Sequence, residues 1–258
     1  MDLRNHTILI TGGTSGLGLE FARQLLALGN TVLLTGRDPA KLRQVQQQLP
    51  AAHVFQSDVS QLSDIQHLCT QVLAQFPQLD MLVNNAGEMR RLNLNDPALD
   101  VATMTREVDS NLLGPIRLVQ ALLPHLKQQA AATILNVSSG LALVPFPVSP
   151  VYCATKAGLH SYTQSLRAQL RGSSVQVFEL LAPAAKTPLI DQFKSLDKSS
   201  LMAPDQLIAA TLRGMRRNQL EIYPGQSTGL RWMDRLAPGF IRRQLSKPLT
   251  QEFGQLSA

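Results

Sequence analysis

Short runs of apolar and β-branched residues alternate with longer amphipathic stretches along most of the chain. The short runs have the character of buried strands, and the longer stretches repeat apolar residues at the spacing of a helix that buries one face. We expect strands at residues 7–11, 31–35, 53–57, 81–84, 133–138 and 175–181. We expect helices at residues 16–28, 39–49, 61–76, 104–128 and 151–170.

This alternation predicts an α/β fold built on a parallel sheet. The strand runs are continuously apolar, which is typical of strands covered by helices on both faces. Right-handed crossovers then give a doubly wound sheet, with a ligand crevice at the carboxyl ends of the strands. Because the 258 residues contain no repeat and no low-complexity linker, we expect a single domain over residues 1–258.

The composition is that of a soluble protein with one large core, since 44% of the residues are hydrophobic and 16% are charged. Two cysteines, Cys69 and Cys153, provide no disulfide framework and indicate a reducing compartment, so we expect a cytoplasmic location. The apolar run at residues 7–11 is too short for a secretory signal. The uncharged stretch at residues 128–155 has the length of a membrane span, but its prolines and polar residues exclude that interpretation.

Most of the net charge of +6 lies near the C-terminus, because eight Lys/Arg and three Asp/Glu follow from Arg213 onward. The rest of the chain is nearly neutral, so its basic balance does not indicate nucleic acid as a partner. Zinc-finger spacing is also absent from the sequence, and we expect no metal.

Residues 226–258 form a basic amphipathic tail. Its apolar positions at 230, 233, 236 and 240–241 follow a helical stripe that is interrupted at Pro238-Gly239. Four arginines and the only tryptophan accompany the stripe. The pattern fits peripheral contact with an anionic membrane. It fits equally well a helix packed on the protein's own body or on a partner subunit.

A glycine-rich turn joins the first expected strand to the first expected helix. Glycines let the backbone approach a pyrophosphate, and the helix N-terminus offers amide donors and a favourable dipole. The spacing is Gly-x-x-x-Gly-x-Gly rather than the commoner Gly-x-Gly-x-x-Gly, and the structural alternative is a mere tight turn. The residues expected to bind a dinucleotide here are Gly12, Thr14, Ser15, Gly16, Leu17 and Gly18.

The second expected strand ends in Leu34-Thr-Gly-Arg37, without the acidic residue that would bind the ribose 2′-hydroxyl of NAD. The guanidinium of Arg37 suits a 2′-phosphate instead, although an ordinary solvated arginine is the alternative. We therefore expect NADP(H) in preference to NAD(H). Side-chain amides at the end of the fourth strand either tie neighbouring strands together or border the cofactor. Further cofactor contacts are expected from Asp58, Val59, Asn85, Ala86 and Gly87.

Tyr152 and Lys156 lie four residues apart in an expected helix and therefore share a face. A neighbouring ammonium favours phenolate and would lower the pKa of Tyr152 from about 10 toward the working pH. Such a phenol can give or take the proton that must accompany hydride transfer at a carbonyl. Ser139 lies thirteen residues before Tyr152 and is the candidate for binding the carbonyl, with Ser138 as a neighbouring competitor.

Together these residues resemble the short-chain dehydrogenase/reductase family in its short, single-domain form. The resemblance covers about residues 5–225. It implies a Rossmann fold with a seven-stranded parallel sheet, NAD(P)(H) binding, and dimers or tetramers built on the helices at about 104–128 and 151–171. The matching residues are Thr11-Gly-x-x-x-Gly-x-Gly18, Asp58, Asn84-Asn-Ala-Gly87, Asn111, Ser139 and Tyr152-x-x-x-Lys156.

The resemblance implies a role for each member of an Asn-Ser-Tyr-Lys set. Tyr152 would donate or accept the proton, and Lys156 would also hold the nicotinamide ribose hydroxyls. Ser139 would bind the carbonyl. Asn111 would kink its helix and hold a water that links Lys156 to solvent.

The chain departs from the family pattern after the sixth strand, where Ala182-Pro183 replaces Pro-Gly. Thr187 keeps the position of a threonine that, by the resemblance, would contact the nicotinamide. The departure is similar to a bacterial branch of uncharacterised oxidoreductases. Residues 188–203 lie where the family has its mobile substrate lid, with a plain surface loop as the alternative. The apolar stretch at 141–148 predicts a hydrophobic pocket wall. The residues that give the lid an amphipathic character are Phe193, Lys194, Leu196, Lys198, Leu201 and Met202.

The sequence thus predicts an NADP(H)-dependent oxidoreductase that interconverts a carbonyl and an alcohol on a small-to-medium apolar substrate, acting on the CH–OH group of donors. One alternative is a non-catalytic NADP(H)-binding or membrane-docking regulatory protein on the same fold. The other is a nucleotide-sugar epimerase or dehydratase, which shares Tyr-x-x-x-Lys but usually carries a longer C-terminal region. We expect a homodimer or homotetramer in the cytoplasm, with possible peripheral membrane contact through the tail.

Overall fold

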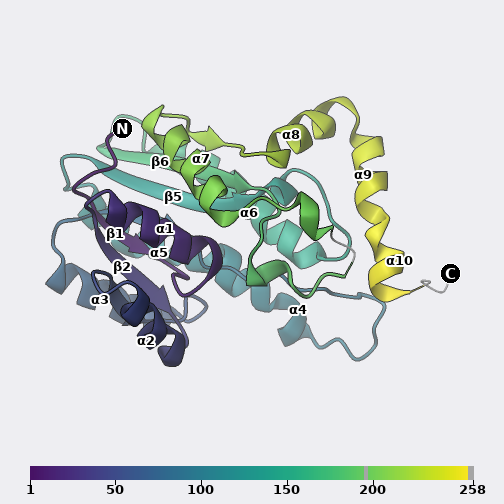
Figure 1. The fold of residues 1–258 in the computed structure, drawn as a ribbon, viewed down its shortest axis with the longest axis horizontal. Helices are drawn as coiled ribbons and strands as arrows, with labels where there is room; N and C mark the ends of the chain where they lie inside the picture. The colour runs from purple at the N-terminus through teal and green to yellow at the C-terminus, as the bar shows by residue number, and fades with distance from the viewer. Residues whose placement is uncertain (195–196, 255–258) are drawn as a thin grey trace.

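A sheet of parallel strands forms the centre of the molecule (Figure 1). The structure is a computed structural model and describes residues 1–194 and 197–254. The sheet has seven parallel strands in the order β3-β2-β1-β4-β5-β6-β7. Strands β2 and β3 are added on one side of β1 and strands β4 to β7 on the other, so the topological switch point lies between β1 and β4. The strands are β1 (Thr7–Ile10), β2 (Thr31–Gly36), β3 (His53–Gln56), β4 (Leu79–Asn84), β5 (Ala132–Ser139), β6 (Val175–Ala182) and β7 (Glu221–Ile222).

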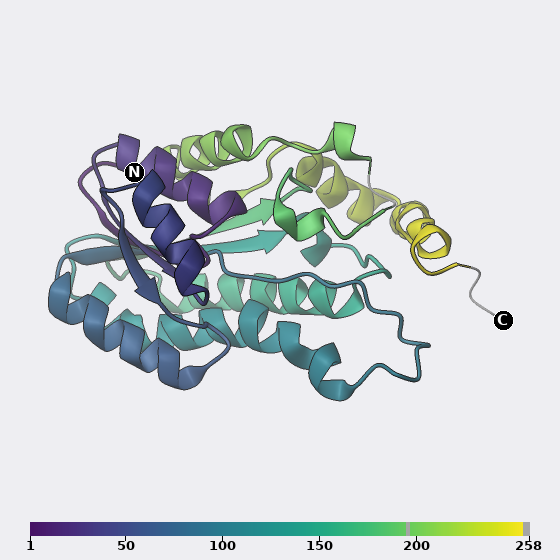
Figure 2. The ribbon, with the colours of Figure 1, turned by 60° about the horizontal axis from the view of Figure 1, so that its bottom comes forward.

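Helices cover both faces of this sheet, as Figure 2 shows. Side chains of α1, α2 and α7 join the core on one face, and those of α3, α5 and α6 join the core on the other. The predicted doubly wound Rossmann fold in one domain is therefore confirmed. The helices are α1 (Gly16–Ala27), α2 (Pro39–Gln48), α3 (Leu62–Gln75), α4 (Val101–Val108), α5 (Gly114–Leu126), α6 (Pro150–Gln169), α7 (Pro204–Arg216), α8 (Gln226–Leu236), α9 (Pro238–Ser246) and α10 (Pro248–Phe253).

The central strands contribute to both layers of the core. In β1, Ile8 and Ile10 pack with Phe21 of α1, whereas Leu9 packs in the opposite layer with Leu68 of α3. Successive strand residues point to opposite faces, and here both faces are covered. The strand must therefore be apolar at every position, which is the pattern visible in the sequence.

The long helix expected at 104–128 is interrupted. A π-helical segment, Asp109–Leu113, lies between α4 and α5 and contains the fully buried Asn111. A π-bulge breaks the regular ladder of helical hydrogen bonds and redirects the side chains within it. Gly114 follows directly, and a Cβ there would lie 2.8 Å from the carbonyl oxygen of Val59, so close packing against the loop after β3 requires glycine.

The segment after β6 was only partly predicted. Neither α7 nor β7 was predicted from the sequence pattern, and β7 pairs with Glu179 and Leu180 over only two residues. The tail forms α8, α9 and α10, and the break expected at Pro238 is the start of α9. In the part of the chain that the structure describes, no helix has the length and apolar character to cross a membrane.

Candidate active site

A cavity of about 760 Å³ opens at the carboxyl ends of the strands. The loops after β1, β2, β3, β4, β5 and β6 line it, together with the start of α6 and parts of α8 and α9. This is the position at which doubly wound sheets bind their ligands. The predicted site residues that line the cavity are Gly12, Thr14, Ser15, Gly16, Leu17, Arg37, Asp58, Val59, Asn85, Ala86, Gly87, Ser139, Tyr152, Lys156 and Thr187.

The glycine-rich turn forms one end of the cavity and is shaped for close backbone approach. Gly12 has a φ of +66°, and a Cβ there would lie 2.8 Å from the Cα of Ala86. Gly16 also has a positive φ, of +54°. Ser15 caps α1 with no side-chain hydrogen bond among the described residues, so the first amides of the helix face the cavity without a side-chain acceptor. Such an N-terminus fits a pyrophosphate.

Gly18, also predicted to bind the dinucleotide, is not among the residues that line the cavity. A Cβ on Gly18 would lie 2.2 Å from the carbonyl oxygen of Gly12 and 2.5 Å from the side-chain nitrogen of Asn85. Gly18 therefore allows α1 to pack against the turn and the end of β4, behind the cavity wall.

The end of β2 presents two cations to the cavity, the exposed Arg37 and Lys41. Asp38 also lines this region, but its carboxylate accepts hydrogen bonds from the amides of Ala40 and Lys41 as the N-cap of α2. The sequence analysis identified Arg37 and missed Lys41, which becomes a candidate only once α2 turns it toward the same opening.

Two buried hydroxyls border this part of the cavity, those of Thr35 and Ser57, and neither has a hydrogen-bond partner among the described residues. Buried polar atoms normally have partners, so these hydroxyls are consistent with a polar ligand. Asp58 is less available, because its Oδ1 accepts the amide of Ser60 at 2.9 Å. Val59 lies beside it in the wall.

The side-chain amides after β4 tie the strands together. Asn84 donates to the Oδ1 of Asn136 on β5, and Asn85 donates to the carbonyl oxygens of Thr11 and Gly12. Asn84 therefore has a structural role, whereas Asn85 both ties the strands together and lines the cavity with Ala86 and Gly87. A Cβ on Gly87 would lie 3.1 Å from Asn111 Oδ1 and 3.6 Å from Lys156 Nζ.

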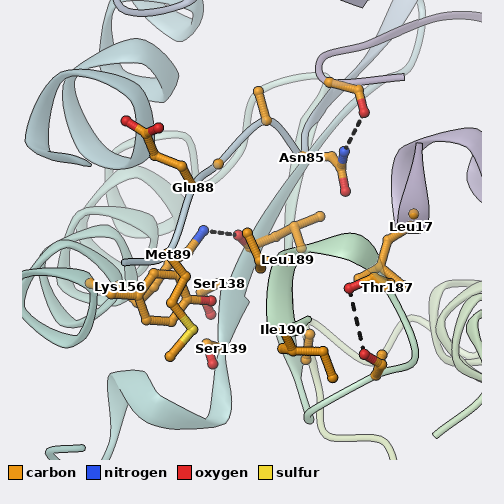
Figure 3. Close-up of a pocket in the computed structure, with 18 of the residues that line it drawn as sticks. Leu17, Asn85, Glu88, Met89, Ser138, Ser139, Lys156, Thr187, Leu189 and Ile190 are labelled. Atoms are coloured by element: carbon orange, nitrogen blue, oxygen red, sulfur yellow. Dashed lines mark hydrogen bonds between the residues drawn. The ribbon is translucent and has the colours of Figure 1, made fainter. Parts of the chain in front are cut away.

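Tyr152 and Lys156 come from the first turns of α6 and are both buried. The Nζ of Lys156 donates to the carbonyl oxygen of Val137 at 2.8 Å and lies 5.7 Å from the centroid of the Tyr152 ring. Ser139 ends β5, and its hydroxyl accepts the amide of Leu141. Figure 3 shows Ser139 and Lys156 on the same side of the pocket, across from Thr187 and Ile190.

The competing serine, Ser138, has a structural partner. Its hydroxyl donates to the buried carboxylate of Glu179 at 2.5 Å, and that carboxylate also contacts His160 of α6. This network ties β5, β6 and α6 together beneath the cavity floor. The hydrogen bond that His160 donates to the Glu179 carboxylate raises the pKa of His160.

Burial controls the protonation of the central pair. It raises the pKa of Tyr152, while a hydrogen bond with Ser139 acts in the opposite direction. Burial lowers the pKa of Lys156 to about 8, against the field of Glu179 and Glu107. The expectation that Lys156 lowers the pKa of Tyr152 does not match the net direction in this structure, where desolvation of the phenol is the larger effect.

Asn111 lies behind the cavity rather than in its wall. Its Oδ1 accepts the amide of Glu88, and its Nδ2 donates to the carbonyl oxygen of Glu88 and to the hydroxyl of Thr155. The side chain thus joins the loop after β4 to α6, one residue before Lys156.

Glu107 is a buried acid that the sequence analysis missed. It lies on α4, four residues before Asn111, is fully buried, and neither carboxylate oxygen has a hydrogen-bond partner among the described residues. Burial raises its pKa to about 7, while the backbone of Arg90 and the charges of Arg90 and Lys156 act in the opposite direction. No sequence signal distinguishes it, because a glutamate on an amphipathic helix is normally exposed.

The opposite end of the cavity is apolar. Leu141 and Phe146 belong to the predicted wall, and Leu189 and Ile190 come from the start of the predicted lid. The tail also lines this end of the cavity. Packing of the tail on the protein's own body was one of the sequence alternatives, but the residues that make the contact were not predicted. Its residues in the cavity wall are Leu230, Met233 and Leu245.

Apolar residues of the predicted lid pack against this apolar end. Phe193 and Leu201 are buried, and the rings of Phe146 and Phe193 lie 6.2 Å apart. Leu196 lies outside the described residues. The unusual Ala182-Pro183 segment also borders the cavity, next to Thr187.

Comparison with known proteins identifies the family. Residues 6–197 match the short chain dehydrogenase family. The chain is 40% identical over 235 residues to an uncharacterised oxidoreductase of Bacillus subtilis, DltE, covering 90% of this chain and 92% of that protein. The chain therefore belongs to the short chain dehydrogenase family of oxidoreductases.

Solved structures share the fold. A short chain dehydrogenase of Burkholderia cenocepacia, in complex with NADP, has a TM-score of 0.82 at 22% identity and covers 95% of this chain and 99% of that one. A 3-ketoacyl-(acyl-carrier-protein) reductase of Brucella melitensis, complexed with NADH, has a TM-score of 0.79 at 29% identity. The match covers 88% of this chain and 100% of that one.

Proposed function

We propose that this protein is an NADP(H)-dependent oxidoreductase that interconverts a carbonyl and an alcohol. The observation that carries the proposal is that the Tyr152 phenol, the Lys156 ammonium and the Ser139 hydroxyl share one cavity with the glycine-rich turn. A dinucleotide site and an acid/base group must be adjacent for hydride and proton to reach one carbonyl group.

The residues around the turn fit a dinucleotide. The α1 N-terminus and Gly12 suit its pyrophosphate, and Arg37 with Lys41 suits the 2′-phosphate that distinguishes NADP from NAD. When bound, the nicotinamide exchanges a hydride with the substrate carbon. Thr187 and Lys156 border the same cavity and would position that end of the cofactor.

The remaining chemistry belongs to the protein. Ser139 would hold the carbonyl oxygen, and Tyr152 would donate its phenolic proton to that oxygen as the carbon gains the hydride. Lys156 would stabilise the phenolate that remains. Asn111 would hold the loop after β4 against α6, next to Lys156. In the oxidation direction the same proton returns to Tyr152.

The substrate should be mainly apolar, because Leu141, Phe146, Ile190, Leu230 and Met233 surround the space beyond the catalytic group. The Brucella melitensis relative is named for reduction of a ketone on an acyl chain, which is a substrate of this type. We propose that the substrates are aliphatic aldehydes and ketones of small-to-medium size. We also propose that the protein is a homodimer or homotetramer and acts in the cytoplasm.

Replacing Tyr152 by phenylalanine tests the proposal. With a series of aldehydes and ketones, consumption of NADPH should fall by at least about a hundredfold, since general acid catalysis contributes on that order. The affinity for NADPH should stay close to that of the parent. Tyr162→Phe is the matched control, because Tyr162 lies on the same helix but packs in the core beneath the sheet. Equal turnover by Tyr152→Phe and the parent would refute the role.

A further inference from the structure

The tail carries an exposed apolar surface that the rest of the molecule does not cover. Of seven large hydrophobic side chains that are exposed among the described residues, three lie within residues 232–240. They are Trp232, Leu236 and Phe240, at 53%, 79% and 54% exposure. Single exposed apolar residues are common, but a cluster of this kind marks an interaction site.

The cluster occupies a corner between two helices. Trp232 and Leu236 lie four residues apart on α8 and share a face, and Phe240 follows at the start of α9. Every residue from 235 to 240 is exposed. The opposite side of the same helices is anchored to the body, since Met233 lines the cavity and Ile241 is buried. Figure 1 shows these two helices along the outer edge of the molecule, at the end that carries the C-terminus.

Basic residues outnumber acidic ones along the stretch that carries the cluster, where Asp234 is the acidic residue between Trp232 and Leu236. Arg235, Arg242 and Arg243 are exposed on the same stretch. Between residues 226 and 254 there are five Lys/Arg and two Asp/Glu. One further arginine, Arg231, is engaged with the body, because its guanidinium lies 4.6 Å from the centroid of the Tyr223 ring.

These observations favour one kind of occupant. A second copy related by a two-fold axis would bring two copies of the same basic patch together, and the repulsion between like charges would oppose the contact. An anionic lipid surface instead complements the arginines and accepts the side chains of Trp232, Leu236 and Phe240 at the boundary between headgroups and acyl chains. We propose that the corner between α8 and α9 docks the protein peripherally on an anionic membrane.

Trp232 makes the proposal directly measurable, because it is the only tryptophan in the chain. The full-length protein would be mixed with vesicles of phosphatidylcholine alone, or of phosphatidylcholine with phosphatidylglycerol. Tryptophan emission should shift to shorter wavelength only with the anionic vesicles, and the protein should sediment with them. Raising the salt concentration should weaken both signals, because exposed charges are then screened. This readout is independent of the proposed reaction.

Two sets of variants separate insertion from simple charge attraction. Leu236→Ser combined with Phe240→Ser should reduce vesicle affinity by about tenfold or more, because two apolar side chains no longer enter the membrane boundary. Both residues are exposed, so the fold should not depend on them. Leu62→Ser is the matched control, since Leu62 is 51% exposed on α3. This control should bind as the parent does.

Four results would overturn the proposal. The first is no emission shift with anionic vesicles at low salt. The second is equal vesicle binding by the double variant and the parent. The third is an equal shift with soluble poly-glutamate, which would indicate an acidic protein partner. The last is a shift that grows with protein concentration in the absence of lipid, which would indicate a second copy.

Discussion

At the scale of single residues, the site depends on charges that are kept away from water. Lys156 and Glu107 are both buried, yet the ammonium donates one hydrogen bond to a backbone carbonyl and the carboxylate has no hydrogen-bond partner among the described residues. Isolated charges in an apolar interior shift their pKa toward the neutral form. Both shifts are in that direction here, with a lowered pKa for Lys156 and a raised pKa for Glu107. Perturbed groups of this kind cluster at functional sites.

The first prediction concerns Arg37 and cofactor choice. Arg37→Ala should weaken NADPH by about tenfold or more, because a charge-assisted contact to the 2′-phosphate is lost. NADH lacks that phosphate, so its affinity should change little. Fluorescence titration with both cofactors measures the ratio. Arg43→Ala, on the outer side of α2, is a suitable control. An unchanged NADPH-to-NADH preference would remove Arg37 from the cofactor site.

The second prediction concerns Glu107 and pH. Its folded-state pKa of about 7 exceeds the ordinary value of 4.5, so folding favours the protonated acid. The contribution of Glu107 to the free energy of unfolding is fully present below its ordinary pKa of 4.5. This contribution is lost as the pH rises through the folded-state pKa of about 7. The difference corresponds to about 3 kcal/mol. Glu107→Gln cannot ionise, so its stability relative to the parent should rise by that order between pH 5 and pH 8.

Urea unfolding of parent and variant at both pH values measures this difference. Glu88→Gln is the matched control, because Glu88 is partly exposed and already pairs with Arg106 at 3.2 Å. A stability difference between Glu107→Gln and the parent that stays constant with pH would show that Glu107 does not ionise within the folded protein.

At the scale of elements, most strands could be predicted because burial on both faces makes every position apolar, and that pattern is visible in the sequence. The run at residues 31–36 is apolar on both faces and is bounded by a helix end and a turn, so its pattern is unambiguous. Its neighbour β7 has only two residues, Glu221 and Ile222, and no periodicity can be read from so short a segment. β7 exists because the edge of β6 offers backbone partners to it.

The helices show the same limit in another form. The interruption at Asp109–Leu113 lies directly before Gly114-Pro115, and Pro115 has no backbone N–H for the helical ladder. The family resemblance implied a kink at Asn111, but the periodicity alone reads as one continuous amphipathic stretch. Packing adds to the local signal, because Gly114 approaches Val59 and Asn111 accepts the amide of Glu88. Sequence periodicity describes each helix by itself, whereas these contacts depend on where the loops after β3 and β4 lie.

The residues of the candidate site also differ in how far the sequence could predict them. Residues in compact motifs, such as Tyr152 with Lys156 and the turn at Gly12, could be identified from spacing because one local element positions them. Residues that reach the cavity from distant elements could not. Lys41 needs the orientation of α2, and Leu245 needs the path of the tail.

At the scale of the whole molecule, the C-terminal tail closes the apolar end of the cavity. α8 packs on the turn after β5, where a Cβ on Gly140 would lie 2.9 Å from Leu230. Further along, Leu249 and Phe253 pack against the cluster that contains Tyr152 and Phe193. The tail therefore connects two surfaces. Its inner side forms part of the cavity wall, and its outer corner is the proposed membrane contact.

A clasp between residues 91 and 252 holds the end of this tail. Arg91 Nη1 lies 3.2 Å from the Oε2 of Glu252, whose side chain is completely buried. The same guanidinium donates to the carbonyl oxygens of Gln192 and Glu252 and lies 5.7 Å from the centroid of the Phe253 ring. Tail, lid and the loop after β4 thus meet at one side chain.

The third prediction follows from this clasp. Arg91→Ala leaves the buried Glu252 carboxylate without its guanidinium, which should cost about 3 kcal/mol. Because the loss is confined to α10 and the lid, we expect local opening of the tail rather than global unfolding. Limited proteolysis should then cleave near residue 247 much faster than in the parent, and the apparent KM for an apolar carbonyl substrate should rise as the cavity wall opens.

Arg106→Ala is the control for the clasp. Arg106 pairs with Glu88 at the same 3.2 Å separation, but its side chain is 46% exposed. Exposed pairs contribute only about 0–1 kcal/mol, so this variant should be cleaved at nearly the parental rate. Equal protection of the tail in both variants would mean that apolar packing of Leu249 and Phe253 alone holds α10 in place. The KM of Arg91→Ala would then match the parent's, because the wall would remain closed.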